Sequence, residues 1–189
     1  ALERAIEGGE EPLVLLVAQK RQSRKRINPE NLYPMGTVAQ VVRKYRLPEG
    51  GYSVLMQGLY RAEIVETRTE DEVLLAAVAE VQPNAKTGIE MEALRRAVSG
   101  QIQEFAEKGN TLPAEIVSLA RRITDPDWLA DLVAAHGGLE IEKQQEILET
   151  LDSYSRLYKV SVHLSEQIHI LDVRDRIQTK IQDGTGFLP

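Results

Sequence analysis

The chain has 189 residues, 42% of them hydrophobic and 28% charged, values typical of a soluble globular protein with one or two domains. Its formal net charge of −6 argues against a dedicated nucleic-acid-binding protein, and no apolar run approaches the roughly 20 residues that a membrane-spanning helix needs. The sequence contains no cysteine, which excludes disulfides and thiolate sites and is consistent with the cytoplasmic location that we expect.

The first part of the chain is rich in predicted strands. Residues 14–19 are a near-continuous apolar run, which is typical of a strand buried on both faces. A second strand is predicted at 37–45, and the proline and paired glycines of 47–51 predict the turn of a hairpin.

The third predicted strand begins at Tyr52 and continues to Thr67, past a bulge that we expect at Gly58. Residues 73–81 predict the last strand, although their leucine and alanine content also suits a helix. Successive hairpins of this kind indicate a small antiparallel barrel or a curled sheet.

A polar segment at 83–88 interrupts this pattern, and every periodic segment after it is helical. The first predicted helix has an apolar stripe at steps of three and four residues, formed by Met91, Leu94, Val98, Ile102 and Phe105. We therefore predict an α+β fold with a strand-rich subdomain at 1–85, a helical subdomain at 86–152, a long C-terminal helix at 153–183 and a tail at 184–189.

Two later helices of the helical subdomain have local signals of their own. Asp125 and Pro126 predict the cap and first turn of a helix in which Trp128, the only tryptophan, is expected to lie in the core. A helix at 140–151 is predicted to face the core with Ile141, Ile147, Leu148 and Leu151.

The segment at 153–182 predicts a single helix about 45 Å long, at a rise of about 1.5 Å per residue. Its apolar seam consists of Leu157, Val160, Leu164, Ile168 and Leu171. Past Val173 charged residues replace the seam, so we expect this end of the helix to project as an arm or to pair with another chain.

The sequence contains no recognisable motif for catalysis or for cofactor binding. It has no GxxxxGK[ST] phosphate-binding loop, no HExxH metal motif and no GxSxG nucleophile elbow. The three histidines, His136, His163 and His169, lack the spacing of metal ligands, and we expect them to be structural or exposed to solvent. We therefore predict no catalytic residue, no metal site and no cofactor in this chain.

Four apolar side chains flank the predicted hairpin turn and are the candidates for binding other proteins: Tyr45, Tyr52, Met56 and Tyr60. Aromatic and methionine side chains suit this role because they offer a large, adaptable contact area. The last three are spaced by four residues and would share one face of a regular strand, but a bulge at Gly58 would break that register. The alternative is that these side chains pack in the core.

Five basic residues lie close together between the first two predicted strands: Lys20, Arg21, Arg24, Lys25 and Arg26. One interpretation is a loop that binds nucleic acid or polyphosphate, and the other is a solvated loop without a ligand. The acidic total charge of the chain favours the second interpretation.

Six segments in a fixed order point to a known family: LVLLVAQK (13–20), GTVAQVV (36–42), LPEG (47–50), VLMQGLYRA (54–62), ITDPDWLADLVAAH (123–136) and KQQEILETLD (143–152). Their order and spacing resemble the N-terminal domain of Lon, the bacterial ATP-dependent protease, over roughly residues 2–182. The resemblance implies that the strand-rich part is a PUA-like barrel or sheet. It also implies that a first strand is missing here, because proteins of this family have at least one strand before this point.

The resemblance further implies a role in recognition, with the chemistry in other domains. Such a domain would recognise unfolded or damaged proteins and pass them to ATPase and Ser–Lys protease domains, which use ATP and magnesium and lie outside this sequence. The other subunits of a homohexamer would be its further partners. Some PUA-like barrels bind RNA, so the alternative function is a nucleic-acid or polyanion module that uses the basic loop at 20–26.

Overall fold

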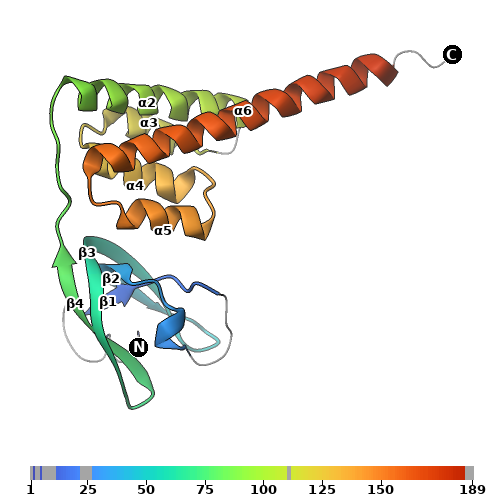
Figure 1. The fold of residues 1–189 in the computed structure, drawn as a ribbon. Helices are drawn as coiled ribbons and strands as arrows, with labels where there is room; N and C mark the ends of the chain where they lie inside the picture. Colours follow the sequence, from blue (N-terminus) through green and yellow to red (C-terminus); the bar gives the residue numbers. More distant parts are fainter. Residues whose placement is uncertain (1, 3–4, 6–11, 22–26, 110–111, 186–189) are drawn as a thin grey trace. The chain divides into compact units, whose positions relative to one another are not determined.

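The computed structural model describes residues 2, 5, 12–21, 27–109 and 112–185, and the chain divides into two compact units, 1–82 and 83–189. An antiparallel sheet occupies the first unit and a set of helices the second (Figure 1). The predicted α+β class, with a strand-rich part followed by helices, is therefore confirmed.

The strands of the first unit follow one another in the sheet in sequence order, β1-β2-β3-β4, and each neighbouring pair is antiparallel. Their bounds are Leu13–Leu16 for β1, Met35–Arg46 for β2, Tyr52–Glu70 for β3 and Val73–Val81 for β4, and a short 3-10 helix, η1, spans Pro29–Asn31. The strand predicted at 73–81 is confirmed. The alternative prediction of a helix for these residues, based on their composition, is wrong.

Extra residues interrupt the pairing of the long strands. The ladder between β2 and β3 skips Leu59, next to Gly58 where a bulge was predicted, and it also skips Val42. The ladder between β3 and β4 skips Val65. Each extra residue bends its strand and increases the local twist. The sheet therefore curls, and β1 and β4 line a common hollow of about 550 Å³ although they are not neighbours in the sheet.

β1 is shorter and less buried than predicted. It covers Leu13–Leu16 rather than 14–19, and the side chains of Leu13 and Leu16 are 54% and 45% exposed. Within the described residues β1 pairs only with β2, so it lies at the edge of the sheet. The apolar run correctly predicted a strand, but the predicted burial of both its faces is wrong. Only strands covered by a layer on each side are buried in that way.

Gly36 allows the close approach of β1 to β2. A Cβ atom at this position would clash with the carbonyl oxygen of Leu16. We expect Gly36→Ala to lower the free energy of unfolding of the sheet unit by about 1–3 kcal/mol, the usual cost of overpacking. Hydrogen exchange of the β1 and β2 amides measures the loss. Gly58→Ala, whose new Cβ would meet only a methyl group of Thr37 at 3.3 Å, should have a smaller effect.

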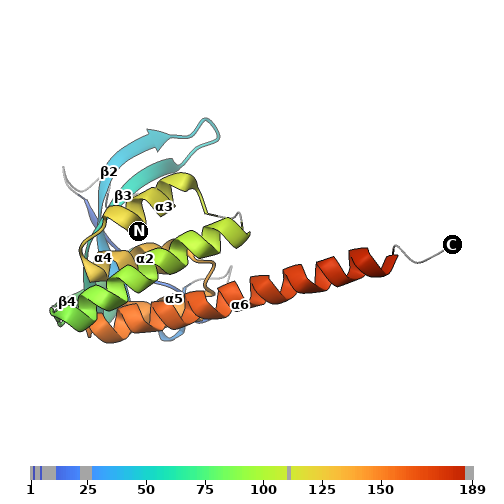
Figure 2. The same ribbon diagram turned by 90° about the horizontal axis from the view of Figure 1, so that it is seen from above.

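The second unit is a bundle of helices. α2 spans Ile89–Gly109, α3 Ala114–Arg122, α4 Pro126–His136, α5 Ile141–Glu149 and α6 Ser153–Thr185. α2 and α6 run side by side, and α4 packs against α6 (Figures 1 and 2). The predicted start of α4 is confirmed, because the Asp125 side chain accepts hydrogen bonds from the backbone N–H groups of Asp127 and Trp128.

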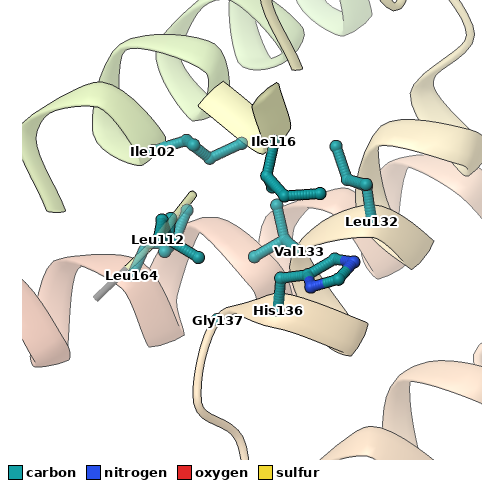
Figure 3. Close-up of a pocket in the computed structure, with 8 residues that line it drawn as sticks. All are labelled: Ile102, Leu112, Ile116, Leu132, Val133, His136, Gly137 and Leu164. Carbon is teal, nitrogen blue, oxygen red and sulfur yellow. The ribbon is translucent and has the colours of Figure 1, made fainter. Parts of the chain in front are cut away.

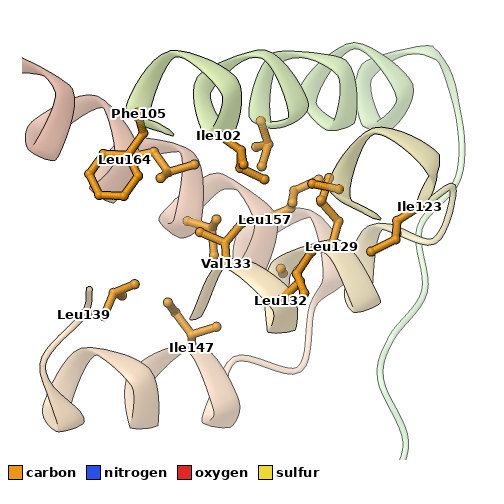
Figure 4. Close-up of a cluster of buried hydrophobic side chains, with 14 of the residues drawn as sticks. Ile102, Phe105, Ile123, Leu129, Leu132, Val133, Leu139, Ile147, Leu157 and Leu164 are labelled. Carbon is orange, nitrogen blue, oxygen red and sulfur yellow. The ribbon is translucent and has the colours of Figure 1, made fainter. Parts of the chain in front are cut away.

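One apolar cluster forms the core of this bundle (Figure 4). It contains the α2 side chains Met91, Val98, Ile102 and Phe105 and the α6 side chains Leu157, Val160, Leu164 and Ile168, with Leu94 and Leu171 partly buried against them. The predicted stripes of both helices are therefore confirmed. From Val173 to Gln182 the side chains of α6 are exposed, and the helix runs on past the end of α2 (Figures 1 and 2). Within the described residues, no helix is long and apolar enough to cross a membrane.

Two apolar side chains predicted to face the core lie outside it. Trp128 is 53% exposed and Ile141 is 47% exposed. On α4 the buried side chains begin at Leu129, and the step of about 100° between successive helical residues turns Trp128 away from them. Ile141 occupies the first position of α5, before the turn that places Ile147 in the core. The helix also ends before Leu151, which is only partly buried.

A polar network is buried inside the helical unit. The side chain of Arg156 is fully buried, and its Nη1 lies 2.5 Å from Asp127 Oδ1. Its Nε donates a hydrogen bond to the Thr150 carbonyl at 2.7 Å, and Ser153 Oγ donates to the other carboxylate oxygen of Asp127 at 2.6 Å. These bonds connect α4, the turn after α5 and the first turn of α6.

A second ion pair connects the beginning of this unit to the start of α6. Lys86 Nζ lies 2.6 Å from Asp152 Oδ2, and Asn84 pairs with Asp152 in an isolated bridge. The Lys86 ammonium, together with hydrogen bonds from Ser155, lowers the pKa of Asp152 from 3.8 to about 2. This carboxylate therefore stays ionised at neutral pH.

Candidate functional site

The hairpin formed by β2 and β3 extends beyond the neighbouring strands (Figure 2). In the part of the chain that the structure describes, β1 pairs with β2 no further than Gln40, and β4 pairs with β3 only from Arg61 onward. Between these limits the two strands pair only with each other. We call residues 42–59 the ribbon.

A tight turn closes the ribbon. The Leu47 N–H donates to the Gly51 carbonyl and the Gly50 N–H donates to the Leu47 carbonyl, both at 3.1 Å. Gly50 and Gly51 have φ angles of 95° and 82°, in the left-handed region that favours glycine. The hairpin turn predicted at 47–51 is therefore confirmed.

The register assigns the side chains of the ribbon to two faces, since alternate residues of a strand point the same way and paired residues share a face. One face carries the paired residues Arg43 and Leu55 and the paired residues Tyr45 and Ser53. The other carries the paired residues Lys44 and Val54 and the paired residues Arg46 and Tyr52. We call these the Tyr45 face and the Tyr52 face.

Large apolar side chains are exposed along the ribbon. Their exposed fractions are 50% for Val42, 56% for Tyr45, 37% for Leu47, 56% for Leu55 and 45% for Leu59. Tyr45 and Leu55 are diagonal neighbours on the Tyr45 face, at a separation that aromatic and long side chains can bridge. They form an exposed apolar pair that a protein partner can cover.

The four side chains predicted to bind proteins do not share one face. Tyr45 lies on the face that bears its name, whereas Tyr52 and Met56 lie on the other. Tyr60 comes after the bulge and pairs with Val38, which is buried. Of the four, only Tyr45 is exposed, and the other three are partly buried. Binding by these residues stays a prediction.

Leu55 is a candidate that the sequence reasoning missed. It is out of phase with Tyr52 and Met56, so a search for one face of the third strand passes over it. Pairing the two strands across the predicted turn would have placed it next to Tyr45.

Three cations lie on the ribbon, Arg43, Lys44 and Arg46, and all three are exposed. Among the residues that the structure describes, no carboxylate lies within ion-pair distance of them. Arg68, elsewhere on β3, differs in this respect, because its Nη2 lies 3.6 Å from Glu70 Oε2.

Only the beginning of the predicted polyanion loop lies in the described part of the chain. Lys20 Nζ donates to the Glu30 carbonyl at 3.3 Å, and the Arg21 N–H donates to Asn31 Oδ1 at 3.0 Å. The other three basic residues, Arg24, Lys25 and Arg26, lie outside the described residues. A polyanion site on this loop therefore stays a prediction.

The sequence matches a family model described as the ATP-dependent protease La (LON) substrate-binding domain, over residues 1–166. The chain belongs to this family. The Lon protease of Geobacter metallireducens is 33% identical over 178 residues, which are 92% of this chain and 21% of that protein. The Lon protease of Trichlorobacter lovleyi is 33% identical over 189 residues, 98% of this chain and 23% of that protein. The chain thus spans about a fifth of the length of these Lon relatives.

Solved structures of Lon domains have a similar fold. The N-terminal domain of the Mycobacterium avium complex Lon protease has a TM-score of 0.62 at 24% identity, covering 80% of this chain and 77% of that one. A Lon N-terminal domain protein from Xanthomonas campestris has a TM-score of 0.51 at 14% identity, covering 78% and 87%. The fold that the resemblance to Lon implied is confirmed.

The helical unit of this Lon domain has a hollow of about 260 Å³ between α5 and α6, lined in part by Glu146, Tyr158 and His163, and a much smaller apolar cavity. The cavity in Figure 3 is lined by Ile102, Leu112, Ile116, Leu132, Val133, His136, Gly137 and Leu164. Its volume of about 10 Å³ admits one water molecule at most. Among the described residues, no group of three or more His, Cys, Asp or Glu side chains is placed to hold a metal ion. The exposed ribbon, with its apolar pair Tyr45 and Leu55, is the candidate site for a protein partner.

Proposed function

We propose that this domain captures unfolded or damaged proteins by the apolar segments that they expose. The observation that supports this function is the ribbon, on which Tyr45 and Leu55 are each 56% exposed on the same face. Covering such side chains is favourable by about 25 cal/mol per Å² of apolar area. The match to a family of substrate-binding domains supports a protein as the partner.

The backbone of the ribbon offers a second kind of contact. Within the described residues, the outer edge of β2 at 42–46 has no strand partner. An extended client segment can add to this edge as a further strand, with main-chain hydrogen bonds that do not depend on the client's sequence. This combination suits a site that accepts many different unfolded proteins.

In the longer protein, the client would pass from this domain to ATPase and Ser–Lys protease domains that use ATP and magnesium. Weak capture by each domain is sufficient if a homohexamer presents several copies, because tethering raises the effective concentration of the further sites. The length of the Lon relatives leaves room for these domains outside the chain. We propose the cytoplasm as the location of this assembly.

The double substitution Tyr45→Ser with Leu55→Ser tests the site. We expect the Kd for a fluorescently labelled, permanently unfolded protein to rise about tenfold, since two exposed anchors are lost. Fluorescence anisotropy measures the Kd. Val65→Ser is the matched control, because Val65 is 69% exposed on β3 but lies outside the ribbon. Its Kd should stay within about twofold of the wild-type value.

Circular dichroism establishes that the variants keep their fold. An unchanged Kd for the double variant would contradict a site on the Tyr45 face. Tyr52→Ala with Met56→Ala tests the predicted residues of the other face, and a loss of binding in that variant alone would move the site there.

A further inference from the structure

The ribbon places a cation beside its exposed apolar pair. On the Tyr45 face, Arg43 is directly opposite Leu55 and two residues before Tyr45. Residues at this spacing on a strand point the same way and lie roughly 7 Å apart. A client side chain that covers Tyr45 and Leu55 therefore brings its neighbours close to the Arg43 guanidinium.

The cations of the ribbon differ from many others in this chain. In the helical unit, Lys86 pairs with Asp152 at 2.6 Å, and Lys159 pairs with Glu146 at 2.9 Å. Within the described residues, Arg43 has no such partner. The only acidic residue between 42 and 59 is Glu49, in the turn. The ribbon is thus a locally basic surface on a chain with a net charge of −6.

We propose that the ribbon selects client segments in which an acidic residue stands two positions from an aromatic or large aliphatic residue. This inference rests on the proposed capture of unfolded proteins. In an extended client paired with the edge of β2, two such residues share a face and repeat the spacing of Arg43 and Tyr45. The client carboxylate then pairs with Arg43, while its apolar neighbour packs against Tyr45.

The chemistry of arginine suits this contact. A guanidinium binds a carboxylate through two parallel hydrogen bonds, and it is more weakly hydrated than an ammonium group, so covering it costs less. The apolar part of the client excludes water from the ion pair and strengthens it. Lys44 and Arg46, on the opposite face, add an attraction that decreases as salt increases.

A single-stranded nucleic acid suits the ribbon less well than an acidic peptide. Proteins that bind such strands stack successive bases on exposed aromatic rings. On the ribbon Tyr45 is exposed, but Tyr52 is partly buried. Leu55, the diagonal neighbour of Tyr45, is aliphatic and provides no ring for stacking.

Two peptides that differ only in charge test the selectivity. One repeats Tyr-Thr-Glu-Thr and the other Tyr-Thr-Gln-Thr, so that the carboxylate or its amide stands two positions from a tyrosine. In anisotropy titrations we expect the glutamate peptide to bind about fivefold more tightly. Arg43→Gln should reduce this ratio to less than about twofold, whereas Lys44→Gln should retain most of it, because Lys44 is adjacent and equally charged but lies on the other face.

Each other result has a distinct meaning. Equal binding of the two peptides overturns the selectivity and leaves the proposed function standing, because the apolar contact remains. Equal losses of the ratio in Arg43→Gln and Lys44→Gln overturn the assignment to one face. Binding of neither peptide overturns the selectivity, and the unfolded protein then tests the proposed function separately. A single-stranded oligonucleotide is the last competitor. If it binds more tightly than the glutamate peptide and Arg43→Gln abolishes this binding, the proposal is overturned in favour of a polyanion site.

Discussion

Replacing Arg156 by methionine is expected to lower the free energy of unfolding of the helical unit by about 3–5 kcal/mol, because Asp127 is left without its partner inside the bundle. Methionine fills much of the volume of the arginine stem, so the lost stability comes from the missing charge rather than from a cavity. The Thr150 carbonyl also loses a donor. Urea denaturation followed by the fluorescence of Trp128, the only tryptophan, reports on this unit.

Arg96→Met is the matched substitution on the surface. Arg96 Nε lies 2.6 Å from Glu92 Oε1, but the Arg96 side chain is 75% exposed. Exposed ion pairs contribute little to stability, so we expect a small change. Combining Arg156→Met with Asp127→Asn should recover part of the stability, since no unpaired charge remains. Equal losses for Arg156→Met and Arg96→Met would contradict the importance of the buried network.

Features that depend on a few neighbouring residues could be predicted from the sequence. The start of α4 follows from Asp125 and Pro126, because the cap needs only a side-chain oxygen and the N–H groups of the next turn. The turn of the ribbon follows from Gly50 and Gly51, whose positive φ angles favour glycine. The buried stripes of α2 and α6 follow from helical periodicity, which each helix encodes on its own.

The faces of the long strands could be predicted only near the turn of the ribbon. They depend on how β2 pairs with β3, and a shift by one residue moves every side chain to the other face. The ladder skips Val42 and Leu59, and the sequence indicated only the bulge near Leu59. The predicted turn alone places Tyr45 and Leu55 on one face, because the ladder is regular from the turn to Arg43 and Leu55, whereas the register beyond Val42 was left open by the local patterns.

The burial of the charged network could not be predicted from the sequence either. Arg156 precedes Leu157 in the seam of α6, where an arginine would ordinarily extend to solvent. Its burial depends on Asp127, which lies 29 residues earlier in the chain. Trp128 shows the opposite error: its apolar character predicted burial, but its position on α4 turns it toward solvent.

Leu164→Ala is expected to lower the free energy of unfolding of the helical unit by about 2–5 kcal/mol, the range for leucines in well-packed cores. Leu164 is fully buried on α6 and borders the small cavity shown in Figure 3. The truncation enlarges a space whose other walls include Ile102 and Val133, which helices hold in place. Because the cost rises with the cavity that remains, we expect a value in the upper half of this range.

Ile177→Ala, on the same helix, provides the contrast for Leu164→Ala. Ile177 is 52% exposed and lies in the part of α6 where the seam has given way to charged residues. Its truncation should change the free energy of unfolding by less than about 0.5 kcal/mol if this end of α6 is a free arm. A loss that grows with protein concentration would instead indicate that the arm pairs with another copy in solution, since association stabilises the folded state by mass action.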